Sequence, residues 1–265
     1  MVDSSIDQIL NIKHTASIQV FTLGKFEVYI DNEKVSSKAW KRDKSLQLFQ
    51  FFILTHHRKA MHKEQIVDKL WHDELDDKSF KVALHGINKV LEPHRKSHAD
   101  SKYLERNGQT YRLLTEDIWV DSIAFEELVS LAHQYFVDQP EKAIAYYRAA
   151  LNMHYGPFLP DRIYEDWSAE ERERLQLIFL GASMSLAELL LESNPMASIQ
   201  LCQDALLVDM AWEEAYRIQM AAYFAKGNRP MAIKTYQICE RVLWDEMALK
   251  PLPETKKLYD KIISV

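Results

Sequence analysis

Apolar positions recur at strand spacing in the first part of the chain and at helical spacing through the rest. In residues 18–118, short β-rich runs at 18–21 and 26–30 precede amphipathic helices and a hairpin. From 119 to 265 the period is almost wholly helical and is interrupted at Pro and Gly. The pattern predicts a mainly α protein, with small antiparallel sheets in an N-terminal domain (18–118) and an all-α second domain (119–265). Residues 1–17 have few large apolar side chains and are expected to form a flexible leader.

The most informative stretch, residues 76–113, combines a two-faced helix with a hairpin. One side of the helix is an apolar stripe: Phe80, Ala83, Leu84, Ile87 and Leu91. The other side carries Lys78, Lys81, His85 and Lys89. Asn107-Gly108 supplies the positive-φ turn of the hairpin, with Arg106 near the tip and Arg112 on the return strand. This is the arrangement of a winged helix-turn-helix, in which a helix enters the major groove of DNA.

Local charge favours nucleic-acid contact by this stretch, although the formal net charge of −6 argues against it. Residues 78–112 hold eight Lys and Arg against three Asp and Glu, whereas residues 64–77 hold one against six. Most cationic helix faces are merely solvated, and a solvated face mixes signs. Here the signs are segregated, and residues 18–120 carry +3 while 121–265 carry −8. The split favours phosphate contact by the first domain and protein or ligand contact by the second.

The second domain contains a recurring pattern of small and aromatic residues. It occurs in three segments: Ala143-Ile144…Tyr147…Ala150, Ser198-Ile199…Cys202…Ala205 and Ala232-Ile233…Tyr236…Cys239. The second and third segments start 34 residues apart, which is the period of tetratricopeptide (TPR) repeats. Small residues let paired helices approach closely, and stacked pairs leave a concave surface that often binds partners. An internal core without a ligand is the alternative.

Several segments together resemble a family of bacterial regulators. In the first domain these are LGKFEVYID, the Ile66/Leu70-Trp71 pattern, FKVALHGINKVLEP and NGQTYRL. They resemble the OmpR/PhoB-type winged helix as it occurs in SARP-type transcriptional activators. In the second domain, VDSIAFEELV, ALNMHYGPFLPD, Trp167 and the long segment that begins ALLVDMAWEEAYRIQ resemble the bacterial transcriptional activator domain. The resemblance covers residues 18–262.

The resemblance implies a DNA-binding transcription regulator, expected to be an activator. The candidates for groove or phosphate contact are Lys41, Arg42, Lys44, Lys78, Lys81, His85, Asn88, Lys89, Arg106 and Arg112. An acidic turn would lie where related proteins contact RNA polymerase: Trp71, Asp73, Glu74, Asp76 and Asp77. The implied partners are double-stranded DNA, RNA polymerase, and a regulatory protein or small ligand at the repeat domain.

The recognition helix departs from the family at two positions. SARP-type proteins usually carry Arg-Leu-Arg after the His, whereas this chain has Gly86-Ile87-Asn88. Two cationic contacts are lost, and a mid-helix Gly costs ~1 kcal/mol relative to Ala, although Asn88 can still read adenine. Restoring both Arg residues is therefore expected to tighten DNA binding. Two alternatives stay open: a signalling protein whose winged helix binds protein, and a sensor that holds a small ligand, such as a nucleotide second messenger, in the repeat domain.

No pattern for catalysis, a cofactor or a metal stands out. The sequence lacks a Walker loop, an HExxH pair and a Gly-x-Ser-x-Gly elbow, so it is expected not to be an enzyme and to need no cofactor. The cluster of His56, His57 and His62 has no Cys or carboxylate at clear ligand spacing. Cys202 and Cys239 are expected to be buried thiols in a reducing cytosol. Without an apparent signal peptide or the ~20 apolar residues that span a bilayer, the protein is expected to be cytoplasmic, with no membrane contact.

A final apolar stripe can be covered in two ways. Leu258, Tyr259, Ile262 and Ile263 are spaced i, i+1, i+4 and i+5, so they share one helix side that must be buried. The helix either folds back on the preceding pair or packs on a second copy of the chain. A dimer would suit DNA binding because two half-sites add their contacts. The sequence therefore leads us to expect a homodimer held through the second domain.

Overall fold

The chain folds into two compact units that are not consecutive in sequence. The computed structural model describes residues 13, 15–56, 60–71, 77–96 and 99–264. The first unit draws on Met1–Phe125 and Met153–Gln176, and the second on Glu126–Asn152 and Leu177–Val265. The domain boundary expected at 118/119 stays a prediction, as does the flexible leader, most of which lies outside the described residues.

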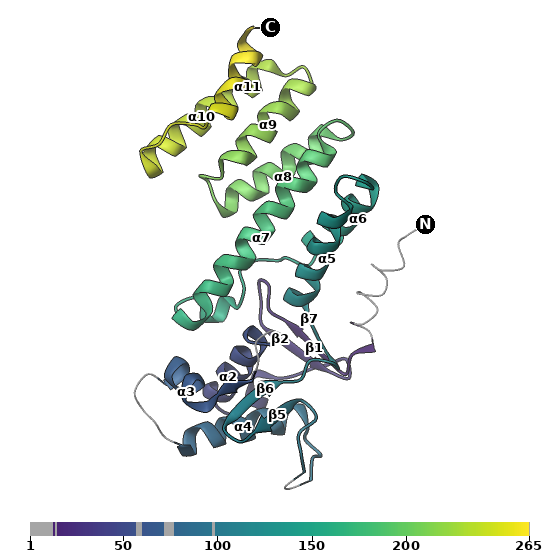
Figure 1. The fold of residues 1–265 in the computed structure, drawn as a ribbon, viewed down its shortest axis with the longest axis vertical. Coiled ribbons are helices and arrows are strands. Elements are labelled where there is room, and N and C mark those ends of the chain that lie inside the picture. Colours follow the sequence, from purple (N-terminus) through teal and green to yellow (C-terminus); the bar gives the residue numbers. More distant parts are fainter. Residues whose placement is uncertain (1–12, 14, 57–59, 72–76, 97–98, 265) are drawn as a thin grey trace. The chain divides into compact units, whose positions relative to one another are not determined.

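The first unit combines short strands with a group of helices (Figure 1). Its strands are β1 (Ile18–Phe21), β2 (Glu27–Ile30), β3 (Glu33–Lys34), β4 (Met61–His62), β5 (Leu104–Asn107), β6 (Thr110–Leu113) and β7 (Ile118–Val120). Its helices are η1 (Ser37–Trp40), α2 (Asp43–Leu54), α3 (Lys63–Trp71), α4 (Asp77–Leu91) and η2 (Pro160–Arg162). The antiparallel pairing of β1 with β2 and of β2 with β3 confirms the expected small sheet. In addition, β7 pairs in parallel with β1, and β4 joins the hairpin in a sheet of order β4-β6-β5.

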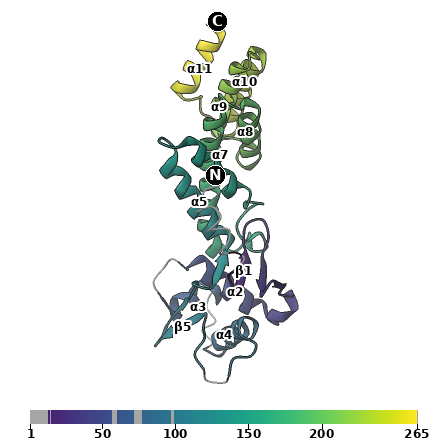
Figure 2. The same ribbon diagram turned by 90° about the vertical axis from the view of Figure 1, so that its right-hand side faces the viewer.

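The core of the first unit is formed by residues of α2, α3, α4, the β5–β6 hairpin and strands β1, β2 and β7. Figures 1 and 2 show these elements close together. The predicted stripe of α4 is confirmed, since Phe80, Ala83, Ile87 and Leu91 are all buried. The ring of Phe80 packs edge-on against Trp71 and Tyr111, with centroid distances of 6.1 and 5.1 Å. These contacts bury one side of α4 and leave its polar side in solvent.

The second unit is built from consecutive helices. They are α5 (Asp121–Tyr135), α6 (Pro140–Leu151), α7 (Asp166–Leu190), α8 (Pro195–Val208), α9 (Glu213–Ala225), α10 (Arg229–Met247) and α11 (Pro253–Ser264), of which α5 and α7 contribute residues to both units. Pro is the first residue of α6 and of α8 and the second residue of α10, where its missing N–H has no helical partner to lose. The side chains of Asn194 and Asn228 accept hydrogen bonds from the first turns of α8 and α10.

The recurring small residues of the sequence lie between packed helices. Ala143, Ala150, Ala205 and Ala232 are fully buried, and α8, α9 and α10 lie side by side in Figure 1. Cys202 and Cys239 are free and buried, as predicted, and burial raises the pKa of each thiol to about 12. A membrane span would need a longer uncharged stretch than any helix in the described part of the chain provides.

The C-terminal stripe is largely covered by the chain itself. Tyr259 stacks on Tyr236 with a centroid distance of 4.0 Å and an interplanar angle of 12°. Ile262 is fully buried, and Leu258 packs in the same cluster against Met220. Three of the four stripe residues are thus covered by the chain itself, whereas Ile263 is 43% exposed. The expected homodimer stays a prediction.

Candidate nucleic-acid interface

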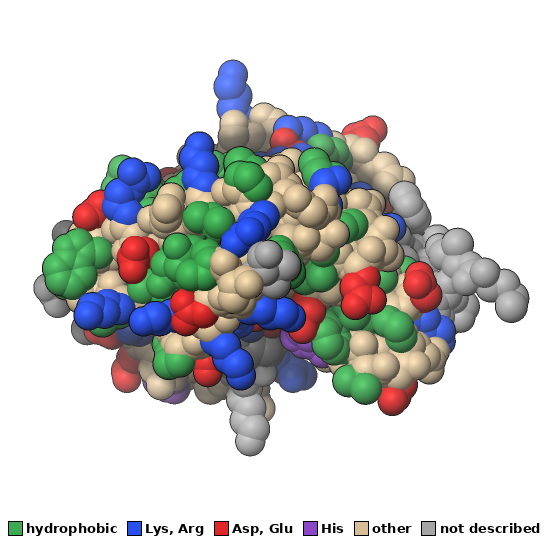
Figure 3. Space-filling model, turned by 90° about the horizontal axis from the view of Figure 1, so that it is seen from above, with side chains coloured by type: hydrophobic (Ala, Val, Ile, Leu, Met, Phe, Trp, Pro, Cys, Tyr) green, Lys and Arg blue, Asp and Glu red, His purple; other side chains and the backbone are tan. Residues whose placement is uncertain are grey.

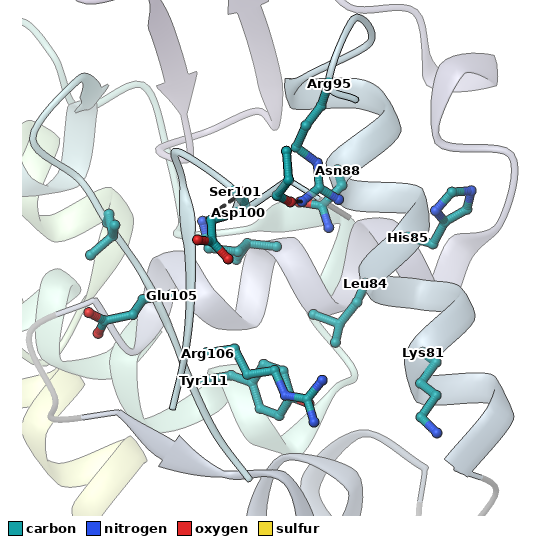
Figure 4. A pocket seen from close by; sticks show the side chains of 13 residues that line it. Lys81, Leu84, His85, Asn88, Arg95, Asp100, Ser101, Glu105, Arg106 and Tyr111 are labelled. Atoms are coloured by element: carbon teal, nitrogen blue, oxygen red, sulfur yellow. Dashed lines mark hydrogen bonds between the residues drawn. The ribbon is translucent and has the colours of Figure 1, made fainter. Parts of the chain in front are cut away.

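A groove of about 690 Å³ runs between α4 and the β5–β6 hairpin (Figure 4). From α4 it is lined by Lys81, Leu84, His85 and Asn88. From the hairpin and the segment before it come Arg95, Ala99, Asp100, Ser101, Leu104, Glu105, Arg106, Tyr111 and Leu114. Leu84, expected in the apolar stripe, is half-buried and faces this groove. The groove thus brings together residues from both halves of the stretch that the sequence singled out.

The polar side of α4 is cationic and exposed. Lys78, Lys81, His85 and Lys89 are all exposed, and their spacing of three, four and four residues places them on one side of the helix. Figure 4 shows Lys81 and His85 on α4, with Arg106 on the facing strand. Cations on two facing walls can contact phosphates that lie between them.

The two arginines of the hairpin differ in their surroundings. The Nε of Arg106 donates to the Gly108 carbonyl at 3.0 Å, and its guanidinium lies 5.7 Å from the centroid of the Tyr111 ring. These contacts stiffen the side chain at the groove and leave its remaining N–H groups for a ligand. Arg112 forms an ion pair with Glu105, its neighbour on the paired strand, which offsets much of its charge.

The cations at the start of α2 comprise two exposed residues and one half-buried residue. Lys41 and Arg42 are exposed in the turn that enters α2. Lys44 is half-buried: its Nζ donates to Gln47 and to the Leu70 carbonyl, and it lies 5.4 Å from the centroid of the Trp71 ring. The structure therefore gives Lys44 a role in joining α2 to the end of α3, while its phosphate contact stays a prediction.

The expected polymerase-contact turn falls largely on undescribed positions. Asp73, Glu74 and Asp76 lie outside the described residues, and Asp77 is described only as the first residue of α4. Trp71 is half-buried and packs on Phe80, so much of its ring serves the core. Contact between this turn and RNA polymerase stays a prediction.

Gly86 lies on the inner side of α4, which changes the meaning of its departure from the family pattern. A Cβ on Gly86 would stand 2.2 Å from the Ser45 Oγ and 2.8 Å from the Ser45 Cβ, and Ser45 is buried in α2. Contacts this short do not occur between real side chains, so α2 and α4 approach closely only because residue 86 is Gly. Residue 86 therefore faces α2, where an Arg side chain could not reach DNA without displacing Ser45. Replacing Gly86 with Arg is no longer expected to tighten DNA binding.

Asn88 lies at the inner wall of the groove with an unsatisfied polar atom. Its Oδ1 is buried and has no hydrogen-bond partner among the residues that the structure describes. An unsatisfied buried acceptor costs roughly 1–3 kcal/mol. A donor from a ligand in the groove, after a small rotation of the side chain, would satisfy this oxygen.

Sequence reasoning missed the residues that shape the far end of the groove. The Glu92 carboxylate accepts hydrogen bonds from Ser101 Oγ and from the Lys102 amide, and this closes the link between α4 and β5. Arg95 donates to the Ala99 carbonyl at 2.7 Å within the same link. Arg95 follows Pro93 in a polar run without periodicity, so its position beside the groove had no signal in the sequence.

The described part of the chain offers no group of three or more His, Cys, Asp or Glu side chains that could hold a metal ion. His57, part of the histidine cluster in the sequence, lies outside the described residues.

A family match adds to this geometry. The bacterial transcriptional activator domain family matches residues 120–263, more than half of the chain. The chain belongs to this family. The match begins at the end of β7 and includes η2 and α7, so this activator domain shares residues with the first unit as well as forming the second. None of the curated proteins is similar enough in sequence to match.

One solved structure shows the fold at low sequence identity. Mycobacterium tuberculosis EmbR, in complex with a low affinity phosphopeptide, matches with a TM-score of 0.80 and 18% identity over 94% of this chain and 65% of the EmbR chain. This chain thus spans about two thirds of the EmbR length, and the likeness shows the fold alone. The C-terminal TPR-containing domain of a Plasmodium falciparum FK506-binding protein matches with a TM-score of only 0.41 and 13% identity, over 57% of this chain and 91% of that domain.

Proposed function

We propose that the chain is a non-enzymatic transcription regulator of the SARP type, whose first unit binds double-stranded DNA as an OmpR/PhoB-type winged helix. In this proposal α4 is the recognition helix in the major groove, and the β5–β6 hairpin is the wing. The family match and the EmbR-like fold support a transcriptional regulator.

One observation carries the DNA-binding proposal: the exposed side of α4 is cationic and borders a groove whose other wall carries Arg106. Lys78, Lys81 and Lys89 would contact phosphates, and His85 and Asn88 would reach base edges. Lys41 and Arg42, exposed before α2, would hold the neighbouring backbone.

The double variant Lys81→Ala/Lys89→Ala is expected to weaken binding to duplex DNA roughly tenfold and to lower the slope of log K against log salt by about two units. The reason is that each lost phosphate contact releases about one fewer counterion. Fluorescence anisotropy with a DNA duplex, selected from a random pool and titrated at several salt concentrations, measures both quantities.

The matched control is Lys256→Ala/Lys257→Ala, which removes the same charge from exposed positions of α11 in the second unit. It is expected to leave the salt slope unchanged. Equal slopes for the wild type and the α4 variant would contradict DNA contact by this side of α4 and would favour a protein-binding role for the groove.

The second unit is proposed as the regulatory surface, where a protein or a small ligand acts. It exposes large apolar side chains, among them Leu207 at 87% and Trp244 at 59%. Figure 3 shows such side chains in small groups among charged ones. Surfaces of this kind on stacked helices commonly bind partners. Leu207→Ser/Trp244→Ser should leave DNA binding intact and reduce transcription in a reporter assay; full activation by this variant would contradict the role.

A further inference from the structure

The segment Met153–Gln176 belongs to the family-matched region, yet it packs within the first unit. Backbone hydrogen bonds attach it to the turn after β1: the Gly24 amide donates to the Pro157 carbonyl and the Leu159 amide to the Thr22 carbonyl, each at 2.9 Å. Gly24 has a φ of +80°, and a Cβ there would stand 2.6 Å from the Tyr155 carbonyl carbon. The close approach requires Gly, so the segment is a fitted part of the first unit.

Arg162 connects this segment to α2. Its side chain is only 10% exposed, and its Nη1 and Nη2 both donate to the carboxylate of Asp43, in the first turn of α2. Its Nε donates to the Gln50 Oε1 at 2.8 Å, two turns further along the same helix. The guanidinium lowers the pKa of the Asp43 carboxyl. A paired fork of this kind fixes direction as well as distance.

Arg162 is itself held in place by α7. The Arg172 guanidinium donates to the backbone carbonyls of Phe158, Arg162 and Ile163. Ser168 Oγ donates to the Arg162 carbonyl at 3.1 Å, and Trp167 packs on Phe51 of α2 with a centroid distance of 5.8 Å. The position of the Arg162 fork is therefore determined by the first turns of α7.

The start of α2 depends on this fork because it lacks a cap of its own. Arg42, the N-cap residue, makes no side-chain capping hydrogen bond. Lys41, the residue before it, has a φ of +58°, a conformation that non-Gly residues rarely adopt. A strained turn persists only where its surroundings hold it. Here the holding contact is made by Asp43, the first residue of α2, which is bound by Arg162.

We propose that Arg162 is a positioning residue for DNA binding: by clamping Asp43 and Gln50 it fixes the turn that presents Lys41 and Arg42 to DNA phosphates. The inference rests on the proposed DNA binding by the first unit. A residue of the activator domain thereby determines the geometry of the DNA-binding surface. Because Arg172 of α7 holds the backbone around Arg162, a movement of α7 would shift Arg162 and, with it, the turn at Lys41 and Arg42.

The first test does not need DNA. Arg162→Met keeps an unbranched side chain about as long as the aliphatic stem of Arg and removes the fork. In the full chain, amide hydrogen exchange at residues 45–47, the first hydrogen-bonded turn of α2, is expected to rise at least about tenfold, while exchange in α8 and α9 stays unchanged. Arg174→Met is the matched control, because Arg174 bonds to Glu171 within α7. Unchanged exchange at 45–47 would overturn the proposal.

The second test is a double-mutant cycle with DNA. Arg42→Ala should lower the salt slope by about one unit in the wild type, and by much less when Arg162 is already Met. A purely structural role would leave the effect of Arg42→Ala the same in both backgrounds, and that result would overturn the proposal. If Lys81→Ala/Lys89→Ala has no effect either, the proposed DNA binding fails; if only the cycle fails, the clamp alone is wrong.

Discussion

Asp121→Ala is expected to lower the unfolding free energy of the first unit by roughly 3–5 kcal/mol. The Asp121 carboxylate is 2% exposed and accepts four hydrogen bonds. The donors are the Thr22 amide at 2.7 Å, the Thr22 hydroxyl at 2.6 Å, the Leu23 amide at 3.1 Å and the Ser122 amide at 2.8 Å. Alanine would leave these buried donors without a partner. Urea unfolding followed by circular dichroism measures the loss.

Two further variants make this prediction specific. Asp121→Asn keeps the Oδ1 acceptor that serves Thr22 and Ser122, so it should lose clearly less stability than the Ala variant. Asp117→Ala removes a carboxylate that is one-third exposed and bonds Ser17 and Lys102, and it should cost at most about 1 kcal/mol. A loss of similar size at Asp117 and Asp121 would contradict the importance given to the buried donors.

Asp121 also predicts a pH dependence. Burial outweighs the hydrogen bonds and raises the pKa of this carboxyl from 3.8 to about 6. Between those values the folded chain keeps a proton that the unfolded chain releases, so this contribution to stability falls as pH rises and is constant above about pH 6. The unfolding free energy of the wild type relative to Asp121→Asn should therefore drop by about 2 kcal/mol from pH 4 to 6. A flat difference would contradict the raised pKa.

Gly86→Ala is expected to destabilise the first unit by about 2 kcal/mol, although Ala is the better helix former. The new Cβ would meet Ser45, whose Oγ and Cβ lie 2.2 and 2.8 Å from its position. For the same reason, Gly86→Arg with Asn88→Arg should weaken DNA binding by distorting α4, the reverse of the effect expected from the sequence.

A double-mutant cycle separates this contact from helix propensity. Ser45→Gly removes both atoms that the Cβ would meet, so it should rescue Gly86→Ala and give a coupling energy of about 2 kcal/mol. Chemical unfolding of the four proteins provides the numbers. If the two substitutions changed the unfolding free energy additively, α2 and α4 would be able to move apart without loss of stability. Residue 86 would then not need to be Gly.

The sequence predicted those features of the fold that depend on local periodicity. Three such features are confirmed by the structure: the stripe of α4, the Asn107-Gly108 turn and the small residues of the repeats. Each depends on residues that are close together in the sequence. The parallel pairing of β7 with β1 joins residues 100 positions apart, and three residues leave no alternation to detect.

The candidate site was predictable only where it depends on one helix. The exposed side of α4 followed from spacing, but the roles of Gly86 and Lys44 depend on neighbours from other helices. Helix propensity alone predicted that Gly86 would destabilise α4. Its contact with Ser45 could not be predicted, because Ser45 lies 41 positions earlier in the sequence. Arg162 gave no signal for a similar reason: its partner Asp43 is 119 residues away.

The interleaving of the two units has a consequence for biosynthesis. The hairpin ends at Leu113, but the first unit is complete only when residues up to Gln176 have been made. At ribosomal rates those ~60 residues take on the order of 3–12 s. During that time α2 lacks the Arg162 fork, and Phe51 lacks the Trp167 ring that packs on it. The nascent chain is therefore expected to become competent for DNA only after Gln176 has been translated.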